Sequence, residues 1–262
     1  MSSGRDRGIV RLAGSGAPSD AAGTHRIDRR NFLRSAGGIL VSSGWLAACD
    51  SKGPQSAQRL LDYAERKNEV LERTLFRHTS MGEARAGVQL AGDAFPSYHV
   101  AADVPVWDAA ANGAWALSIG GLVKVPLKIS LEALMAMPRV TQRVPHFCVE
   151  GWTAVAEFTG VRVRELAALV GAEANAGYVD FASFDDTYHE SWDRESAEHD
   201  QTIIVYAKDG QLLTPAYGAP ARVHSPVKLG YKNTKYLTTL TFMAERNGGY
   251  WSDEGYEWYG GT

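Results

Sequence analysis

The sequence predicts an α+β domain that follows an export leader. Short segments with alternating apolar and polar residues, typical of half-buried strands, recur between residues 115 and 243, and only a few short helical segments interrupt them. No Gly-x-Gly-x-x-Gly or P-loop pattern occurs, which argues against common dinucleotide and nucleotide sites. With 262 residues and 45% hydrophobic content, the chain is long enough for one globular domain with a sizeable core.

The first 48 residues have the features of an export signal. Residues 1–25 show no apolar period, and we expect them to be disordered. The paired Arg29 and Arg30, followed by Phe32 and Leu33, resemble a twin-arginine signal, and the apolar run behind them is too short to span a bilayer. This route exports folded proteins, often after they have received a cofactor. The alternative is a basic, disordered N-terminus.

Residues 46–49, Leu-Ala-Ala-Cys, resemble a lipobox in which Cys49 becomes an acylated N-terminus that tethers the protein to a membrane. The alternative is an ordinary Ala-rich cleavage site, because such runs also occur by chance. Asp50 resembles an inner-membrane retention signal. Either way we expect a periplasmic mature protein, with a helix or linker over 49–80 and the main domain over 81–262.

Charge is distributed unevenly between the leader and the mature chain. The leader holds seven Arg and three Asp, and the formal net charge of the whole chain is -3, so the remainder is acidic. A mildly acidic mature domain argues against nucleic acid as a partner. The charge does not indicate which small molecule binds.

Residues 56–77 are predicted to form an amphipathic helix with Ser56 as its N-cap. Leu60, Leu71 and Leu75 recur on one face, which we expect to pack against the domain. The polar face mixes both charge signs, so we interpret it as a packing helix and not as a membrane binder.

The remaining elements follow in order along the chain. A strand ends at the Gly120-Gly121 turn and its neighbour returns from there, and Pro138 and Gly171 end two short helices. Asp209-Gly210 is a hairpin turn signal, and the aromatic tail 248–262 is expected to pack along the surface. The predicted strands are 115–119, 122–129, 140–144, 178–184, 203–207, 211–213, 221–224 and 236–243, and the predicted helices are 130–137 and 163–170.

The only cysteine besides Cys148 is Cys49, which belongs to the export-signal motif, so the folded domain after it cannot form an intramolecular disulfide. The Cys148 thiol has several alternative roles. It could be buried and inert, which is usual for a lone cysteine, or a nucleophile paired with His146 on the same strand face. A zinc site would need further Cys or His ligands at suitable spacing. A soft metal held mainly by a non-protein ligand needs one thiolate only, and this role also agrees with the export leader.

Two motifs in the chain resemble the sulfite oxidase family of molybdopterin enzymes. The first covers residues 147–153 and 158–161 around Cys148, and the second covers 203–213, 218–223 and 228–237. The resemblance extends over about residues 95–245 and is closest to the periplasmic methionine sulfoxide reductase catalytic subunits. It implies a mixed α+β fold around one molybdenum–molybdopterin cofactor, with Cys148 as the metal ligand, Glu150 near the metal, and His146 in place of an Arg of that subgroup.

The same resemblance implies a set of cofactor-binding residues. Arg222 and Lys235 are expected to bind the pterin phosphate, with Lys232 as a further candidate, because cations form charge-assisted hydrogen bonds with phosphate. Backbone N–H groups of Asn233 and Thr234 are expected to add donors. The remaining candidates by position are Tyr98, His99, Ser183 and Tyr217.

One loop could be mistaken for a metal site. It carries Asp185, Asp186, His189, Asp193 and His199, but their spacing matches no standard ligand set. We therefore interpret the loop as a solvated rim of the active site.

The family resemblance implies oxygen-atom transfer at a sulfur centre of a small or protein-bound substrate. Sulfoxide reduction is the first choice and sulfite oxidation the second, because the Gly-Asn-Arg-Arg run that follows the cysteine in vertebrate-type sulfite oxidases is absent. No Cys-x-x-Cys-His haem motif occurs, so electrons must pass to or from a separate partner, such as a membrane haem protein. The alternative of a different class is a non-catalytic exported lipoprotein that uses the fold as a binding module.

Overall fold

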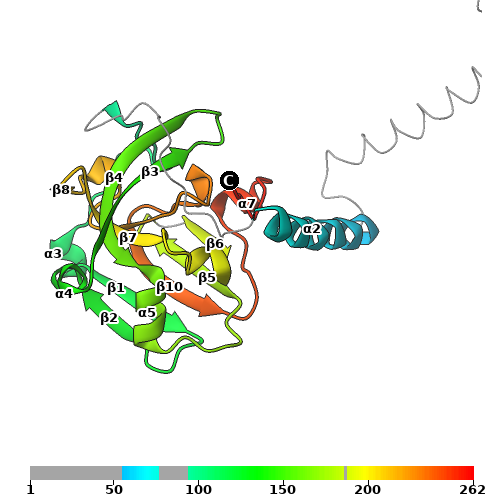
Figure 1. Ribbon diagram of the computed structural model, residues 1–262, viewed down its shortest axis with the longest axis horizontal. Coiled ribbons are helices and arrows are strands. Elements are labelled where there is room, and N and C mark those ends of the chain that lie inside the picture. Colours follow the sequence, from blue (N-terminus) through cyan, green and yellow to red (C-terminus); the bar gives the residue numbers. More distant parts are fainter. Residues whose placement is uncertain (1–54, 77–93, 186–187) are drawn as a thin grey trace, which may run out of the picture. The chain divides into compact units, whose positions relative to one another are not determined.

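The computed structural model describes residues 55–76, 94–185 and 188–262 of the chain (Figure 1). They form two five-stranded sheets and a few short helices, which agrees with the predicted α+β class. The chain divides into two units, Met1–Leu61 and Asp62–Thr262, and the described part of the first unit is only the start of helix α2 (Gln55–Leu75). Within the described ranges, no helix has the length and apolarity needed to cross a membrane. The predicted export signal and Cys49 lie outside the described residues.

The first sheet has the strand order β2-β1-β10-β5-β6. Strands β1 and β10 come from opposite ends of the domain sequence and pair in parallel, whereas the other neighbours in this sheet are antiparallel. This pairing closes the domain around its main apolar core. The strands are β1 (Ala116–Gly121), β2 (Leu127–Ser130), β5 (Tyr178–Ser183), β6 (His189–Asp193) and β10 (Leu237–Met243).

The second sheet is built on a long hairpin that ends at the cysteine motif. Its order is β3-β4-β7-β8, and β9 pairs with β7. The last β3–β4 pair is Phe147 with Thr153, so residues 148–152 form the hairpin loop. The strands are β3 (Val140–Phe147), β4 (Thr153–Arg162), β7 (Ile203–Lys208), β8 (Gln211–Leu212) and β9 (Arg222–His224).

The predicted helix ends are confirmed by their caps. The Ser130 side chain accepts from the first turn of α4 (Leu131–Ala136), and Gly171 ends α5 (Val163–Val170) in the left-handed conformation that glycine adopts without steric cost. The remaining helices are single turns. They are α3 (Ala109–Asn112), α6 (Arg194–Ala197), α7 (Tyr250–Asp253), and the 3-10 turns η3 (Pro215–Tyr217) and η4 (Gly230–Lys232).

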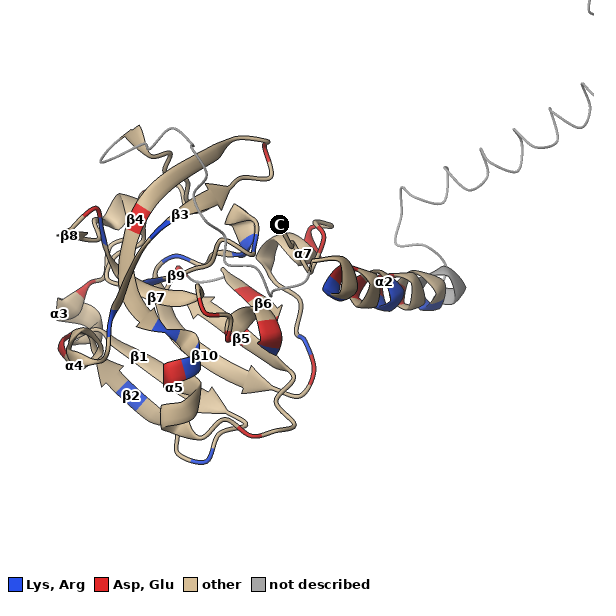
Figure 2. Cartoon of the chain, in the orientation of Figure 1, with Lys and Arg blue, Asp and Glu red and all other residues tan. Residues whose placement is uncertain are grey.

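Helix α2 spans Gln55–Leu75, close to the predicted range 56–77, so Ser56 lies inside the helix and not at its N-cap, and the packing also differs from the prediction. Leu71 and Leu75 are 55% and 67% exposed, and the contacts to the domain come from the charged face. Glu69 is buried, and Arg246 pairs with Glu65 at 2.7 Å. Figure 2 shows charges of both signs along α2. The expectation that the apolar face packs was wrong, because Arg246 on the domain offers the charged face an ion-pair partner.

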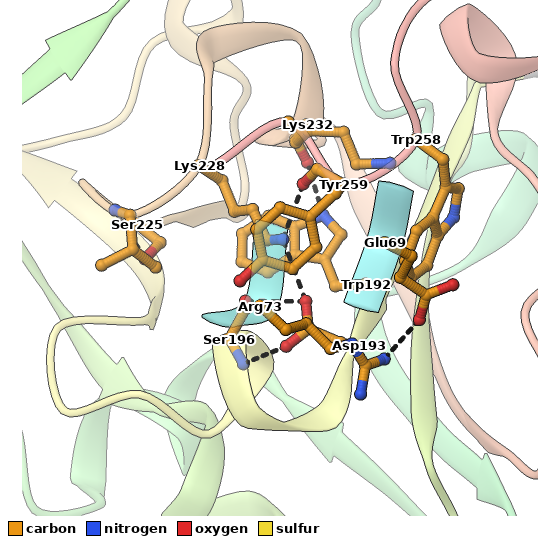
Figure 3. A network of polar contacts seen from close by, with 12 residues as sticks. Glu69, Arg73, Trp192, Asp193, Ser196, Ser225, Lys228, Lys232, Trp258 and Tyr259 are labelled. Carbon is orange, nitrogen blue, oxygen red and sulfur yellow. Dashed lines mark hydrogen bonds and ion pairs between the residues drawn. The ribbon is translucent and has the colours of Figure 1, made fainter. Parts of the chain in front are cut away.

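The loop predicted as a solvated rim is mostly buried secondary structure. Asp193 ends β6, caps α6 and forms a fully buried ion pair with Lys228 at 2.9 Å (Figure 3). Glu190 of β6 forms a second buried pair with Lys232 at 2.5 Å. The Lys228 ammonium also lies 3.5 Å from the ring centroid of Tyr259. The rim interpretation was therefore wrong for β6, and Tyr259, in the tail expected to lie on the surface, belongs to the buried interior.

Replacing Gly160 with alanine should destabilise the fold by about 3 kcal/mol, because overpacking forces backbone atoms apart. A Cβ at Gly160 in β4 would lie 2.1 Å from the Ile204 carbonyl oxygen in β7. Gly120 in β1 is the matched control, since a Cβ there meets no atom within 4 Å. Urea unfolding of Gly160→Ala and Gly120→Ala measures the difference, and equal losses for both would contradict the packing argument.

Candidate active site

A cavity of about 350 Å³ lies between the cysteine loop, the segment from residue 95 to 100, and the turn before β10. It brings together residues that are far apart in the sequence. Eight of the eleven residues predicted for the site line it, and three do not. The lining residues from that set are Tyr98, His99, His146, Cys148, Glu150, Arg222, Asn233 and Lys235.

Backbone hydrogen bonds hold the cysteine loop in shape. The Cys148 N–H donates to the Trp152 carbonyl at 2.9 Å, and the Gly151 N–H donates back to the Cys148 carbonyl at 3.0 Å. Gly151 has a φ of +88°, a conformation that side chains rarely adopt. The loop thus presents Cys148 and Glu150 to one cavity.

The Cys148 thiol is free and half-buried. Burial raises its pKa, and the carboxylate of Glu150, whose Oε2 is 3.9 Å from Sγ, acts in the same direction. A thiol with a raised pKa is a poor nucleophile by itself, because the reactive form is the thiolate. Metal ligation also needs the thiolate, and a metal cation bound at the sulfur would supply the positive charge that stabilises it.

His146 contacts another histidine in place of the thiol. Its Nδ1 lies 3.3 Å from Nε2 of His224, and the two rings stack. Burial lowers the pKa of His146 to about 3, with the nearby Arg222 and Lys235 acting in the same direction. The imidazole is therefore neutral. Among the described residues, no contact between His146 and Cys148 supports the pairing of base and nucleophile considered from the sequence.

Glu150 and Tyr98 both meet Trp152. The Trp152 Nε1–H donates to Glu150 Oε2 at 3.0 Å, and the Tyr98 ring stacks on Trp152 with centroids 6.0 Å apart. The tryptophan therefore fixes the carboxylate at the cavity, on the exposed side of the loop.

Arg222 and Lys235 are cations without a carboxylate counterion among the described residues. Arg222 is only 3% exposed. Its guanidinium donates to backbone carbonyls, including that of Asn233 at 3.1 Å. The Lys235 ammonium donates to the carbonyls of Tyr98 and Ala216 at 2.6 and 2.9 Å. Across the described ranges, neither cation forms an ion pair with a carboxylate. Unpaired buried charge is costly, so this part of the cavity is suited to an anion.

Lys232 does not take part in this arrangement. Its ammonium is fully buried and pairs with Glu190, so the expectation that it contacts a cofactor phosphate was wrong. The N–H groups of Asn233 and Thr234 donate to the carbonyls of Gly230 and Lys232. In this structure those two donors are therefore used within the turn.

Two other predicted residues form hydrogen bonds that fix segments of the cavity wall. The Asn233 side chain accepts from the Ser225 N–H at 2.7 Å and donates to the Leu229 carbonyl at 3.0 Å, which fixes the turn that carries Lys235. Tyr217 does not line the cavity, but its hydroxyl donates to the Phe95 carbonyl at 2.9 Å.

Ser183 and Thr234 also lie outside the lining. Ser183 Oγ accepts from the Asp185 N–H at 2.9 Å, and Asp185 is the one described member of the predicted rim that reaches the cavity. The described residues contain no group of three or more His, Cys, Asp or Glu side chains placed to hold a metal ion.

The sequence reasoning missed two buried residues beside Arg222. His224 lies two positions along β9, so an extended strand places it on the same face as Arg222, and this spacing was an available signal. Tyr236 lines the cavity in a left-handed backbone conformation that no sequence pattern indicated. The cavity wall also includes aromatic residues that were not predicted, namely Tyr188, Tyr231, Trp251 and Tyr256.

Comparisons with known proteins identify the family of the chain. Residues 101–251 match the family described as the oxidoreductase molybdopterin binding domain. A putative protein-methionine-sulfoxide reductase subunit YedZ1 from Azospira oryzae is 35% identical over 238 residues, covering 89% of this chain and 88% of that protein. The chain belongs to the sulfite oxidase family of molybdopterin-binding oxidoreductases.

Other known proteins show lower similarity. The uncharacterized oxidoreductase YuiH of Bacillus subtilis is 31% identical, covering 63% of this chain and 82% of that protein. The protein-methionine-sulfoxide reductase catalytic subunit MsrP of Campylobacter jejuni is 25% identical, covering 88% and 78%. Among solved structures, the sulfane dehydrogenase SoxCD from Paracoccus pantotrophus aligns with 50% of this chain and 38% of its own, with 23% identity and a TM-score of 0.48.

The family establishes the enzyme class and the cofactor. The predicted family, α+β fold, molybdenum dependence and molybdopterin cofactor are confirmed. The side chains present also fit this cofactor. Arg222 and Lys235 offer its phosphate two cations that have no counterion in the described part of the chain, and Cys148 offers a soft sulfur donor for the metal.

Proposed function

We propose that this chain transfers an oxygen atom at a sulfur centre, with reduction of a sulfoxide as the reaction. The observation that carries the proposal is one cavity lined by the Cys148 thiol and by two cations, Arg222 and Lys235, that form no ion pair within the described ranges. The choice of substrate is supported by relatives named as protein-methionine-sulfoxide reductases, one of which this chain matches over 88% of its length.

In this proposal Cys148 holds the metal, and Arg222 and Lys235 hold the phosphate of the pterin. When bound, the cofactor supplies a metal that accepts and donates electrons in pairs. Conversion of a sulfoxide to a sulfide and water consumes two electrons and two protons. Glu150, fixed by Trp152 at the cavity, is the residue we assign to proton delivery. His146 is neutral and packs between Trp152 and His224, so it shapes the cavity wall without adding charge.

We further propose that the enzyme works in the periplasm and receives electrons from a separate membrane haem protein. The chain has no Cys-x-x-Cys-His motif for a haem of its own, and relatives are named as subunits. The twin-arginine pair and the lipobox ending at Cys49 support export and tethering. In this arrangement the leader covers residues 1–48 and the catalytic domain covers 81–262.

The function is tested on protein that has matured and been exported in its native route. Elemental analysis should find about one molybdenum per chain. With an artificial electron donor, methionine sulfoxide should support turnover, whereas sulfite with an artificial acceptor should support little. Absence of molybdenum would favour the non-catalytic binding module, and turnover with sulfite alone would favour sulfite oxidation.

The free energy of unfolding of the cofactor-free protein should rise as the pH is increased from about 7 to about 10. Burial, with Arg222 adding to it, lowers the pKa of Lys235 to about 7, below the usual lysine value. Over this interval Lys235 is protonated in the unfolded chain but largely neutral in the folded one. The unfolded chain therefore binds more protons, and raising the pH favours folding. The stability gained in this way is lost again as the pH falls through about 7. Urea unfolding across this pH range measures the slope. Lys235→Met should lose part of it, and an unchanged slope would contradict the shift.

A further inference from the structure

Tyr236 combines two unusual properties at the cavity. Its hydroxyl is buried and has no hydrogen-bond partner among the described residues, although the side chain lines the cavity. Its backbone φ is +56°, in the left-handed region that aromatic residues rarely occupy. The other non-glycine residue with positive φ in the described ranges is Asp209, which lies in the Asp209-Gly210 hairpin turn, where this conformation is common. Tyr236 lies in no such hairpin turn.

The left-handed conformation has a clear geometric consequence. In an extended strand, consecutive side chains point to opposite faces. Lys235 and Tyr236 are consecutive, yet both line the cavity. The strained residue is held from both sides, because its carbonyl accepts from the Phe184 N–H at 2.9 Å and Leu237 begins β10 directly after it. Backbone strain of this kind is typical of functional sites.

The surroundings of the hydroxyl define the ligand that it can bind. Burial raises the pKa of Tyr236 to about 12, against the opposing effect of Arg222, so the phenol remains a proton donor near neutral pH. Arg222 and Lys235 line the same cavity and lack carboxylate partners in the described part of the chain. A buried donor beside two unpaired cations matches an anionic oxygen.

We propose that Tyr236 is the third donor of an oxyanion site, with its hydroxyl donating to an anionic oxygen held by Arg222 and Lys235. The ligand is a phosphate monoester, and its source is the bound cofactor, because a hydroxyl closed to solvent suits a resident group better than an exchanging substrate. This assignment rests on the proposed function. An anionic substrate such as sulfite has the same donor requirements, so the experiment separates the two sources.

Tyr206 supplies a matched control. It is also buried with an unpartnered hydroxyl, but it lies on β7 and does not line the cavity. Tyr236→Phe and Tyr206→Phe each remove one unsatisfied hydroxyl, so each cofactor-free variant should unfold at a urea concentration equal to or above that of the wild type. This measurement establishes that Tyr236→Phe folds.

The decisive measurement is cofactor release from natively matured enzyme, followed as molybdenum that stays with the protein over time in mild urea. Tyr236→Phe should release the cofactor about tenfold faster than wild type, the effect expected for losing one hydrogen bond to a charged group. Tyr206→Phe should match the wild type. A wild-type release rate combined with a dissociation constant for sulfite raised about tenfold would keep the oxyanion site and assign it to the substrate.

A wild-type release rate and a wild-type dissociation constant for sulfite would overturn the proposal. If the wild-type protein carries no molybdenum, the proposed function fails by itself, and calorimetry with inorganic phosphate then decides the role of Tyr236. Weaker phosphate binding by Tyr236→Phe than by wild type and Tyr206→Phe would support the oxyanion site. Equal binding by all three, or none, would overturn it.

Discussion

Cys148→Ser should reduce turnover by more than about a hundredfold, which is the upper end of the effect for residues that merely support a metal ligand. A serine hydroxyl is a harder and far less acidic donor than a thiol, so it cannot replace a soft thiolate on a redox-active metal. The loop itself should persist, because its hydrogen bonds run between the backbone groups of Cys148, Gly151 and Trp152.

Two measurements distinguish a lost ligand from a lost fold. X-ray absorption at the molybdenum edge should show one sulfur neighbour fewer in the variant, while the urea unfolding midpoint stays near that of the wild type. Thr153→Ala is the control in the same hairpin, because Thr153 is exposed and does not line the cavity, and it should keep wild-type turnover. Wild-type turnover by Cys148→Ser would show that Cys148 is not the metal ligand.

Elements with local signals were predictable from the sequence. The α5 helix ends at Gly171, α4 begins after Ser130, and the β7–β8 hairpin turns at Asp209-Gly210, because caps and turns depend on a few adjacent residues. Strand β4 was not predicted as a strand. Much of it is buried on both faces, so its sequence lacks the alternation that indicates a half-buried strand.

Long-range pairing explains the other errors. The charges of β6 suggested solvent exposure, but Glu190 and Asp193 are neutralised by Lys232 and Lys228, which lie more than 30 residues further along the chain. No local pattern contains such a partner. The packing of α2 depends in the same way on Arg246, which only the folded domain places beside the charged face of the helix.

The site residues that lie in the family motifs could be predicted from the sequence. The motifs correctly brought Cys148, Arg222 and Lys235 to one cavity, although they come from the β3–β4 loop, β9 and the turn before β10. They did not indicate the His224 contact or the left-handed backbone at Tyr236. Such features depend on tertiary packing around this particular set of side chains and not on residue type or spacing.

Arg222→Met and Lys232→Met both remove a buried cation near the same turn. We expect Lys232→Met to lose more stability and Arg222→Met to lose more cofactor. Arg222 has no carboxylate partner in the described ranges, so methionine removes an unpaired charge, and the cofactor-free protein should change in stability by no more than about 1 kcal/mol. Lys232 neutralises Glu190. Its replacement leaves a buried carboxylate alone and should cost about 3–5 kcal/mol.

For cofactor content the order of the two variants should be reversed, with the larger loss in Arg222→Met. In natively matured protein, Arg222→Met should retain less than about a tenth of the wild-type molybdenum, since phosphate loses a charge-assisted donor. Lys232→Met protein that remains folded should retain far more, because its ammonium points to Glu190 and not into the cavity. Urea unfolding of the cofactor-free forms and elemental analysis of the matured forms complete the comparison. A large stability loss in Arg222→Met with full molybdenum content would mean that Arg222 is a structural cation, and the anion site would then have to rest on Lys235 alone.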